Sequence, residues 1–387
     1  MKRLFIILAL SFAAAGISLA VSFFAPLPIP FYQDFSVMYF TDLGLLHGIS
    51  IYAYPAQLAF IKTLTPASFT FHPNPYPPWY ALATVFLGLL PIQAAARMWF
   101  LINLALIGAT AWLLTPGWKV IPHILAALAA IMFIPTFGLL IVGQYSAPVL
   151  LGAALFIKST REKSSAWTAA GLLLMTFKPH IGGILFLAGF VWLVFEKAPF
   201  ARRALIFTIF GGLFLAAAGF VADPAWPLTY LQSLGRYRDI PGVQTCGLCA
   251  SLSVSLVRLV SGQSNTGVAA WVGLILAAGA GIMLFWRFRA HLKDSAALTV
   301  LSATLTLLID PYLLNYDYIL LLAPLFWLAR RDKLAALVYV IPWAALALGR
   351  NGNGLLALAG LVTFILILRQ PIDAPSREAY NGFITIK

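Results

Sequence analysis

The chain has 387 residues, of which 61% are hydrophobic and only 10% are charged. Soluble domains carry roughly 25% charged residues, so this composition, with a mean hydropathy of +0.92, excludes an ordinary soluble protein and predicts an all-α polytopic integral membrane protein. The formal net charge of +13 comes from cations in short loops between apolar runs, which is the pattern that orients a membrane protein, and we expect no nucleic-acid partner.

The first apolar run covers residues 4–25 and follows the cations Lys2 and Arg3. A secretory signal has an apolar region of only about 7–15 residues, so we expect an uncleaved first span. The further expected spans are 77–91, 98–114, 145–158, 166–177, 181–195, 203–222, 267–287, 295–309, 313–329, 334–349 and 354–369. Several are shorter than the ~20 residues of a straight span, which indicates broken helices around a cavity.

Residues 119–142 leave the number of crossings open. Arg97 and Lys158 are both expected inside, so the apolar segment between them must leave and return on the outer side. Pro122 and Pro135 permit a re-entrant pair of half-helices, and a second pair of short spans is equally consistent. We therefore expect 12 or 14 crossings in one transmembrane domain, residues 1–369, followed by a short cytoplasmic tail, residues 370–387.

The cationic loops place the polar residues of interest on one face of the membrane. The basic runs 158–163, 202–203, 287–293 and 330–333 are expected inside. The outer side then holds the long loops 26–76 and 223–266 and the short turns around Gln144, Lys178 and Asp317. A set of polar residues gathered on one face is typical of a site.

The first outer loop, residues 26–76, has the pattern of a structured segment. Its apolar positions between Phe35 and Leu46 fit a helix lying along the membrane interface and ended by Gly48, and a second short helix is expected around 56–64. The Pro-rich run 71–79 then leads into the next span, and prolines hold such a run in one conformation. We expect this loop to be a scaffold for a site.

Six short motifs occur in a suggestive order. They are Asp34-Phe35, Leu46-His47-Gly48 with Tyr52, Tyr76-Pro77-Pro78, Gly143-Gln144, Lys178-Pro179, and Pro311-Tyr312 with Tyr316-Asp317. Together, over roughly residues 25–330, the chain resembles glycosyltransferase family 87, the polyprenol-phosphate-mannose-dependent mannosyltransferases. The resemblance implies a GT-C-type multi-span helical bundle with its active site on the extracytoplasmic face, and a prokaryotic plasma (inner) membrane as its location.

By that resemblance, Asp34 matches the carboxylate that serves as general base. A sugar hydroxyl is a poor nucleophile, and a carboxylate within hydrogen-bond reach can take its proton as the new bond forms. The alternative is that Asp34 only caps the helix that follows. Asp42, eight residues further on, is expected to be a solvated interfacial residue.

Lys178 and His180 lie in an otherwise apolar stretch. A Lys at mid-membrane costs about 2.5–3.5 kcal/mol on insertion scales, and such residues usually mark function. We expect Lys178, with His180, to bind the phosphate of a lipid-linked donor and to stabilise the departing phosphate. A Lys178 side chain that snorkels at an ordinary outer turn is the alternative.

The remaining candidates are expected to contact substrate. Gln144 follows Gly143 at a corner, where its amide can bind sugar hydroxyls or tie off helix-end carbonyls. The last outer turn brings Tyr316 with two carboxylates, Asp317 and Asp310; Asp310 departs from the usual family pattern, which has a small polar residue near that position. Tyr76 and His72 in the Pro-rich run complete the set.

No metal site or cofactor is predicted. The chain has no Asp-X-Asp pair, and its five His residues lack the spacing of zinc ligands. Cys246 and Cys249 lie in the loop 223–266, which should face an oxidising compartment, so we expect a local disulfide, with two free thiols as the alternative. Residues 250–259 then fit an interfacial helix rather than a span.

Two classes of function are consistent with these patterns. In the first, the protein transfers mannose or another hexose or pentose from a polyprenyl-phosphate donor to a glycan or lipid hydroxyl, with inversion. In the second it is a transporter or flippase, since broken helices and buried charges also mark transport sites. Two repeated halves and polar residues near the midplane, which a transporter should show, are not found in the sequence. The patterns predict no oligomeric state.

Overall fold

The structure is a computed structural model. It describes residues 13, 16–21, 23–24, 33–66, 69–117, 119–329 and 331–371, and the side chains of Gln33, Arg350 and Asn351 are not described. The expected first span, 4–25, and the expected tail, 370–387, lie largely outside the described residues. Within these residues the fold is helical and has no strands, only an isolated bridge between Cys249 and Leu314.

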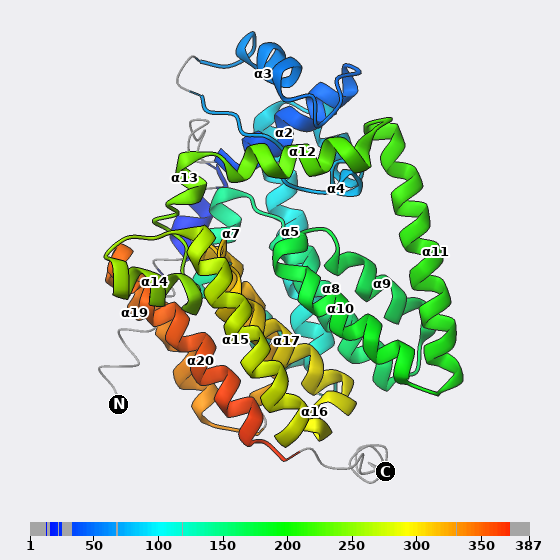
Figure 1. The fold of residues 1–387 in the computed structure, drawn as a ribbon, viewed down its shortest axis with the longest axis vertical. Coiled ribbons are helices and arrows are strands. Elements are labelled where there is room, and N and C mark those ends of the chain that lie inside the picture. The colour runs from blue at the N-terminus through cyan, green and yellow to red at the C-terminus, as the bar shows by residue number, and fades with distance from the viewer. Residues whose placement is uncertain are drawn as a thin grey trace.

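A bundle of helices forms the body of the molecule, and a smaller helical layer covers one end of it (Figure 1). The bundle comprises α5 (Ile92–Leu114), α6 (Val120–Ile131), α7 (Ile134–Val142), α8 (Ser146–Arg161), α9 (Ser165–Met175), α10 (Pro179–Phe195), α11 (Pro199–Ala222), α15 (Thr266–Arg287), α17 (Ser295–Ile309), α18 (Leu322–Leu328), α19 (Leu334–Ala347) and α20 (Asn353–Arg369), with the 3-10 helices η3 (Asn315–Leu321) and η4 (Gly349–Gly352).

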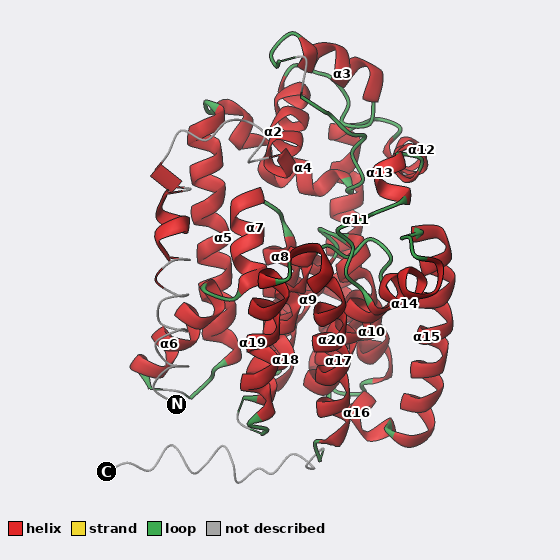
Figure 2. Ribbon diagram, turned by 90° about the vertical axis from the view of Figure 1, so that its left-hand side faces the viewer, coloured by secondary structure: helices red, strands yellow, loops and turns green. Residues whose placement is uncertain are grey.

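The covering layer is formed by parts of the two long expected outer loops together with residues 78–89. These residues were expected to lie in a membrane span, 77–91, and instead belong to this layer (Figure 2). It contains α2 (Gln33–Leu46), α3 (Tyr54–Lys62), α4 (Pro78–Thr84), η2 (Val85–Leu89), α12 (Trp226–Arg238) and α13 (Pro241–Gln244). Figure 2 shows α2, α3 and α4 above the bundle, with α16 (Arg289–Lys293), one of the cationic segments, at the other end. The covering layer and this cationic segment therefore lie at opposite ends of the molecule (Figure 2). Arg97, which was expected on the same side as the cationic segments, instead lies near the start of α5, directly after η2 of the covering layer.

Three described helices, α5, α11 and α15, are long and apolar enough to cross a membrane. The segment 119–142 is indeed a broken pair: α6 and α7 are bent by 62° at the break between them. Pro135 stands in the first turn of α7, where its missing N–H costs nothing. Shorter helices occupy the expected spans 145–158, 166–177, 181–195, 295–309, 334–349 and 354–369, and 313–329 is divided into η3 and α18. The protein is therefore a polytopic helical membrane protein.

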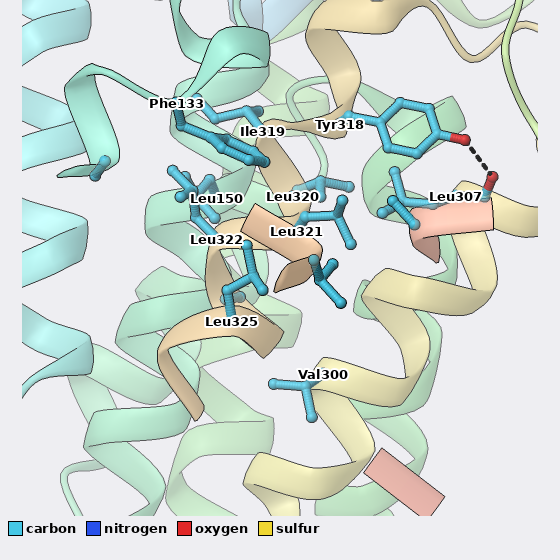
Figure 3. Close-up of a cluster of buried hydrophobic side chains, with 14 of the residues drawn as sticks. Phe133, Leu150, Val300, Leu307, Tyr318, Ile319, Leu320, Leu321, Leu322 and Leu325 are labelled. Atoms are coloured by element: carbon cyan, nitrogen blue, oxygen red, sulfur yellow. Dashed lines mark hydrogen bonds between the residues drawn. The ribbon is translucent and has the colours of Figure 1, made fainter. Parts of the chain in front are cut away.

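The main hydrophobic core fixes η3 within the bundle. Figure 3 shows Ile319, Leu320 and Leu321 packed among side chains such as Phe133, which directly precedes α7, and Leu150 of α8. The Tyr318 hydroxyl donates to the carbonyl of Ala250 at 2.8 Å and to that of Leu307 at 3.5 Å. These contacts hold the short segment that carries Tyr316 and Asp317, two of the candidate site residues.

The helices expected in the outer loops are present, with one correction. Helix α2 ends before Gly48, which has a left-handed φ of 75°. A short helix, α14 (Leu252–Ser261), lies where an interfacial helix was expected at 250–259. Asp42, however, was expected to be solvated and is 0% exposed. Helix α2 packs its third turn against η2, where Gly88 approaches the Asp42 backbone so closely that a Cβ would lie 3.3 Å from it, so the prediction for Asp42 was wrong.

Candidate active site

A cavity of about 530 Å³ lies where the covering layer meets the bundle. Its walls come from the start of α2, the Pro-rich run 72–76, the α7–α8 corner, the start of α10, the last two turns of α12 and residues 312–317. Eight of the sequence candidates line it: Asp34, His72, Tyr76, Gln144, Lys178, His180, Tyr316 and Asp317. Folding thus gathers motifs that are distant in the chain around one space.

Asp34 lies in the first turn of α2 and is partly exposed to the cavity. One carboxylate oxygen, Oδ2, accepts a hydrogen bond from the Gln144 amide Nε2 at 2.8 Å. His72 lies on the cavity wall, where burial lowers the pKa of its imidazole, partly offset by the negative charge of Asp34. Asp34 is therefore held in place by an amide donor and still faces the cavity.

Gln144 connects the two sides of the cavity. Its Nε2 donates to Asp34 and, at 3.0 Å, to the Tyr316 hydroxyl, while its Oε1 accepts from Lys178 Nζ at 3.0 Å. The corner before it is fixed by Gly143, whose φ of 71° is left-handed, and a Cβ there would lie 2.5 Å from the Cβ of Phe35. Only glycine suits that conformation and that close approach, which brings α7 against α2 and Gln144 against Asp34.

Lys178 and Asp317 form a buried ion pair beside Gln144. Their side chains are each 1% exposed, and Nζ lies 2.6 Å from Oδ1. Lys178 also donates to Ser146 Oγ at 3.0 Å, and Ser146 in turn donates to Asp317 Oδ1 at 2.6 Å. Burial of such a pair is tolerated only when further hydrogen bonds satisfy both charges, and the polar neighbours provide them.

Asp317 is also tied to its own turn and to α10. Its Oδ2 accepts from the Leu314 backbone N–H at 3.2 Å and lies 3.8 Å from His180 Nε2. The His180 side chain is 31% exposed and lines the cavity. His180 is thus the member of this group that remains accessible from the cavity.

Asp310 does not belong to the cavity wall. It is buried at the end of α17, where its Oδ1 accepts from the Tyr312 backbone N–H at 2.9 Å. Burial raises the pKa of this carboxyl to about 6, opposed by the nearby His180. Tyr312, two residues on, is the residue of this turn that lines the cavity.

Sequence reasoning missed the contribution of α12. Tyr230, Leu234, Tyr237 and Arg238 line the cavity, and their spacing places them on one face of the helix. Burial raises the pKa of Tyr237 to about 12, with further contributions from Asp34 and Asp317. The sequence does show aromatic and basic residues at helical spacing in this segment, which we had treated only as part of the loop 223–266. It does not show which surface that helix face would contact.

Cys246 and Cys249 form a disulfide between α13 and α14. Neither residue lines the cavity, and Cys249 packs with Val254, Val257 and Ala269. Among the described residues, no group of three or more His, Cys, Asp or Glu side chains is arranged to hold a metal ion, and independence from metals stays a prediction.

The comparison with known families decides the class of the protein. The sequence model of glycosyltransferase family 87 matches residues 74–311. The chain belongs to glycosyltransferase family 87. No curated protein matches it. The matched part contains Gln144 and Lys178, while Asp34, Tyr316 and Asp317 lie outside it and join the same cavity through tertiary contacts. The protein is a membrane glycosyltransferase.

Proposed function

We propose that this glycosyltransferase transfers a sugar from a polyprenyl-phosphate donor to a hydroxyl of a glycan or lipid acceptor, on the extracytoplasmic face of a prokaryotic plasma membrane. Mannose is the first choice of sugar, and another hexose or a pentose is the alternative. The transporter or flippase hypothesis is set aside because the family is one of glycosyltransferases. The GT-C-type architecture is part of the same proposal.

The observation that carries the proposal is a cavity lined by both a partly exposed carboxylate, Asp34, and an accessible imidazole, His180. Asp34 faces the cavity from α2, and His180 faces it from α10 beside the Lys178–Asp317 pair. The volume of about 530 Å³ lies within the range of small-molecule sites, ~300–1,000 Å³. This cavity has room for a sugar between a proton acceptor and a proton donor.

In the proposed reaction, the acceptor hydroxyl oxygen attacks the anomeric carbon as Asp34 takes the hydroxyl proton. The bond between the anomeric carbon and the donor's phosphate oxygen breaks, and its electron pair leaves with the phosphate. A protonated His180 can donate to that oxygen and so stabilise the developing charge. A single displacement of this kind inverts the configuration at the anomeric carbon.

Lys178 has a different place in this scheme from the one that we expected. Its three N–H donors are directed at Gln144, Ser146 and Asp317, and the side chain is 1% exposed. We therefore assign to Lys178 the role of orienting Gln144, which in turn holds Asp34 and the Tyr316 hydroxyl. Direct contact of Lys178 with phosphate would require it to give up one of these bonds.

The test is to incubate the purified protein in lipid nanodiscs with a panel of polyprenyl-phosphate sugars and to measure the release of polyprenyl phosphate. One donor should be consumed in preference, and NMR of the product should show the anomeric configuration opposite to that of the donor. Retention of configuration would contradict the single displacement. Release of lipid phosphate from none of the donors would contradict the donor class.

A further inference from the structure

Because the ammonium group of Lys178 is fully hydrogen-bonded within the protein, His180 is the one cationic partner assigned so far to the donor phosphate, and it is charged only when it is protonated. An ammonium group has three N–H donors, and Lys178 uses them on a carboxylate, an amide and a hydroxyl at 2.6–3.0 Å. Among the described residues, the other basic side chains of the cavity are His72, His180 and Arg238. Burial lowers the pKa of His72, so that residue is neutral at pH 7.

Arg238 is the permanently charged member of this group. Its side chain is 71% exposed, and the guanidinium makes a single long polar contact among the described residues, from Nε to Asp239 Oδ1 at 3.4 Å. Exposed pairs of this kind are weak. The two terminal nitrogens carry four of the five N–H donors of the group, and they remain available at the cavity wall.

Helix α12 is anchored so that Arg238 is presented to the cavity. Ser233 Oγ donates to the Asn74 carbonyl at 2.7 Å, and the ring of Tyr230 lies 5.6 Å from that of Tyr52. Leu234, Tyr237 and Arg238 follow on the face that lines the cavity, and Figure 1 shows α12 running across the end of the bundle. These contacts fix the middle of the helix, and Arg238 lies in its last turn.

We propose that Arg238 binds the phosphate of the lipid-linked donor and stabilises it as it leaves. The inference rests on the proposed function and adds to it a residue that the sequence did not single out. When the bond between the anomeric carbon and the phosphate oxygen breaks, its electron pair stays on the phosphate, and the fork of the Arg238 guanidinium can make two parallel hydrogen bonds to it. The acceptor proton goes to Asp34, so the carboxylate loses one negative charge as the leaving phosphate gains one.

The experiment separates phosphate binding from turnover. A short-chain polyprenyl phosphate and the polyprenol of the same length are titrated into the wild-type protein and into Arg238→Gln, Arg238→Lys and Arg236→Gln. Arg236 is the matched control, since it is an exposed cation of the same helix that does not line the cavity. Loss of a charged hydrogen-bond partner should weaken phosphate binding by about 10- to 100-fold in Arg238→Gln, with partial recovery in Arg238→Lys and no change in Arg236→Gln.

Binding of the polyprenol should be the same in all four proteins. Equal phosphate affinity of Arg238→Gln and wild type, or no preference of wild type for the phosphate over the polyprenol, would overturn the inference. If Arg238 controls phosphate affinity but no polyprenyl-phosphate sugar is turned over, the phosphate site stands and the proposed reaction fails. If wild type turns over the donor and Arg238→Gln does so with an unchanged KM, the reaction stands and the role of Arg238 fails.

Discussion

The two ends of α2 carry one carboxylate each, and the structure gives them opposite surroundings. Asp34 in the first turn is partly exposed to the cavity and accepts a hydrogen bond from Gln144 at 2.8 Å. Asp42 in the third turn is 0% exposed, and among the described residues neither of its oxygens accepts a hydrogen bond of normal geometry. Burial raises the pKa of Asp42 well above its ordinary value, partly offset by the nearby Thr84 side chain.

This difference teaches that two carboxylates on one helix can have different chemical prospects. A general base must reach its substrate, and of the two only Asp34 lines the cavity. A carboxyl that is buried without partners is stable only in its neutral form. The comparison therefore supports the proposed role of Asp34 and favours a neutral Asp42.

The largest expected effect is on turnover. Asp34→Asn keeps the shape of the side chain but removes the proton acceptor, so the rate should fall by about 10²–10⁴-fold, the usual contribution of a general base. Asp42→Asn, the matched change on the same helix, should leave the rate within about threefold because it replaces one neutral group by another. Release of polyprenyl phosphate measures both, and equal losses in the two variants would contradict the comparison.

The buried ion pair gives the next largest effect, on stability. Lys178→Met leaves Asp317 buried and without its cation, which should cost about 3–5 kcal/mol. The exposed pair Lys158–Glu162, 3.3 Å apart, provides the control, and Lys158→Met should cost no more than about 1 kcal/mol. Thermal unfolding in detergent compares the two variants. A double variant, Lys178→Met with Asp317→Leu, should recover most of the stability without recovering activity.

The raised pKa of Asp42 should make the stability of the protein depend on pH. Because its pKa is raised in the folded protein, the folded state binds the proton more tightly than the unfolded chain. Wild-type stability from this group is therefore fully present below about pH 4, the ordinary pKa of Asp, and is lost as the pH rises toward the folded pKa. Asp42→Asn should become more stable relative to wild type as the pH rises above about 4. A difference that does not change with pH would show that Asp42 is ionised in the fold.

Asp310→Asn should also become more stable relative to wild type as the pH rises, but only over a limited pH range. Its pKa is raised to about 6, so the advantage of Asp310→Asn over wild type should grow between about pH 4 and pH 6 and then stay constant. Two pKa steps correspond to about 3 kcal/mol, which is the upper limit of the effect. Melting temperatures of Asp310→Asn and wild type measured across pH 4–8 test this plateau, and a difference that does not change with pH would contradict the raised pKa of Asp310.

Local patterns were sufficient for much of the fold and for most of the cavity wall. Apolar periodicity located α2 and α14, and the two prolines of 119–142 allowed for the break between α6 and α7. The unusual polarity of Gln144, Lys178 and Asp317 within apolar surroundings marked them as candidates, and all three line the cavity. Such residues are conspicuous in the sequence because burying them in a membrane protein is costly.

Other features followed from contacts that no local pattern contains. The burial of Asp42 depends on η2 lying against α2, and the exclusion of Asp310 from the wall depends on how the turn after α17 is folded. The basic and aromatic face of α12 gained its meaning only when the helix was placed over the Pro-rich run by the contact between Ser233 and Asn74. Sequence reasoning treated each of these segments alone.

The sequence by itself determined that this protein is a polytopic helical membrane protein and which polar residues are unusual enough to carry its chemistry, because hydropathy and helical periodicity are local properties. Only the tertiary structure decided which charged side chains are paired within the protein and which are accessible from the cavity. Gln144 reaches Asp34 across 110 residues of chain, and Lys178 reaches Asp317 across 139. The state of a charged group depends on its burial and its partners, and both are set by segments that meet only when the chain folds.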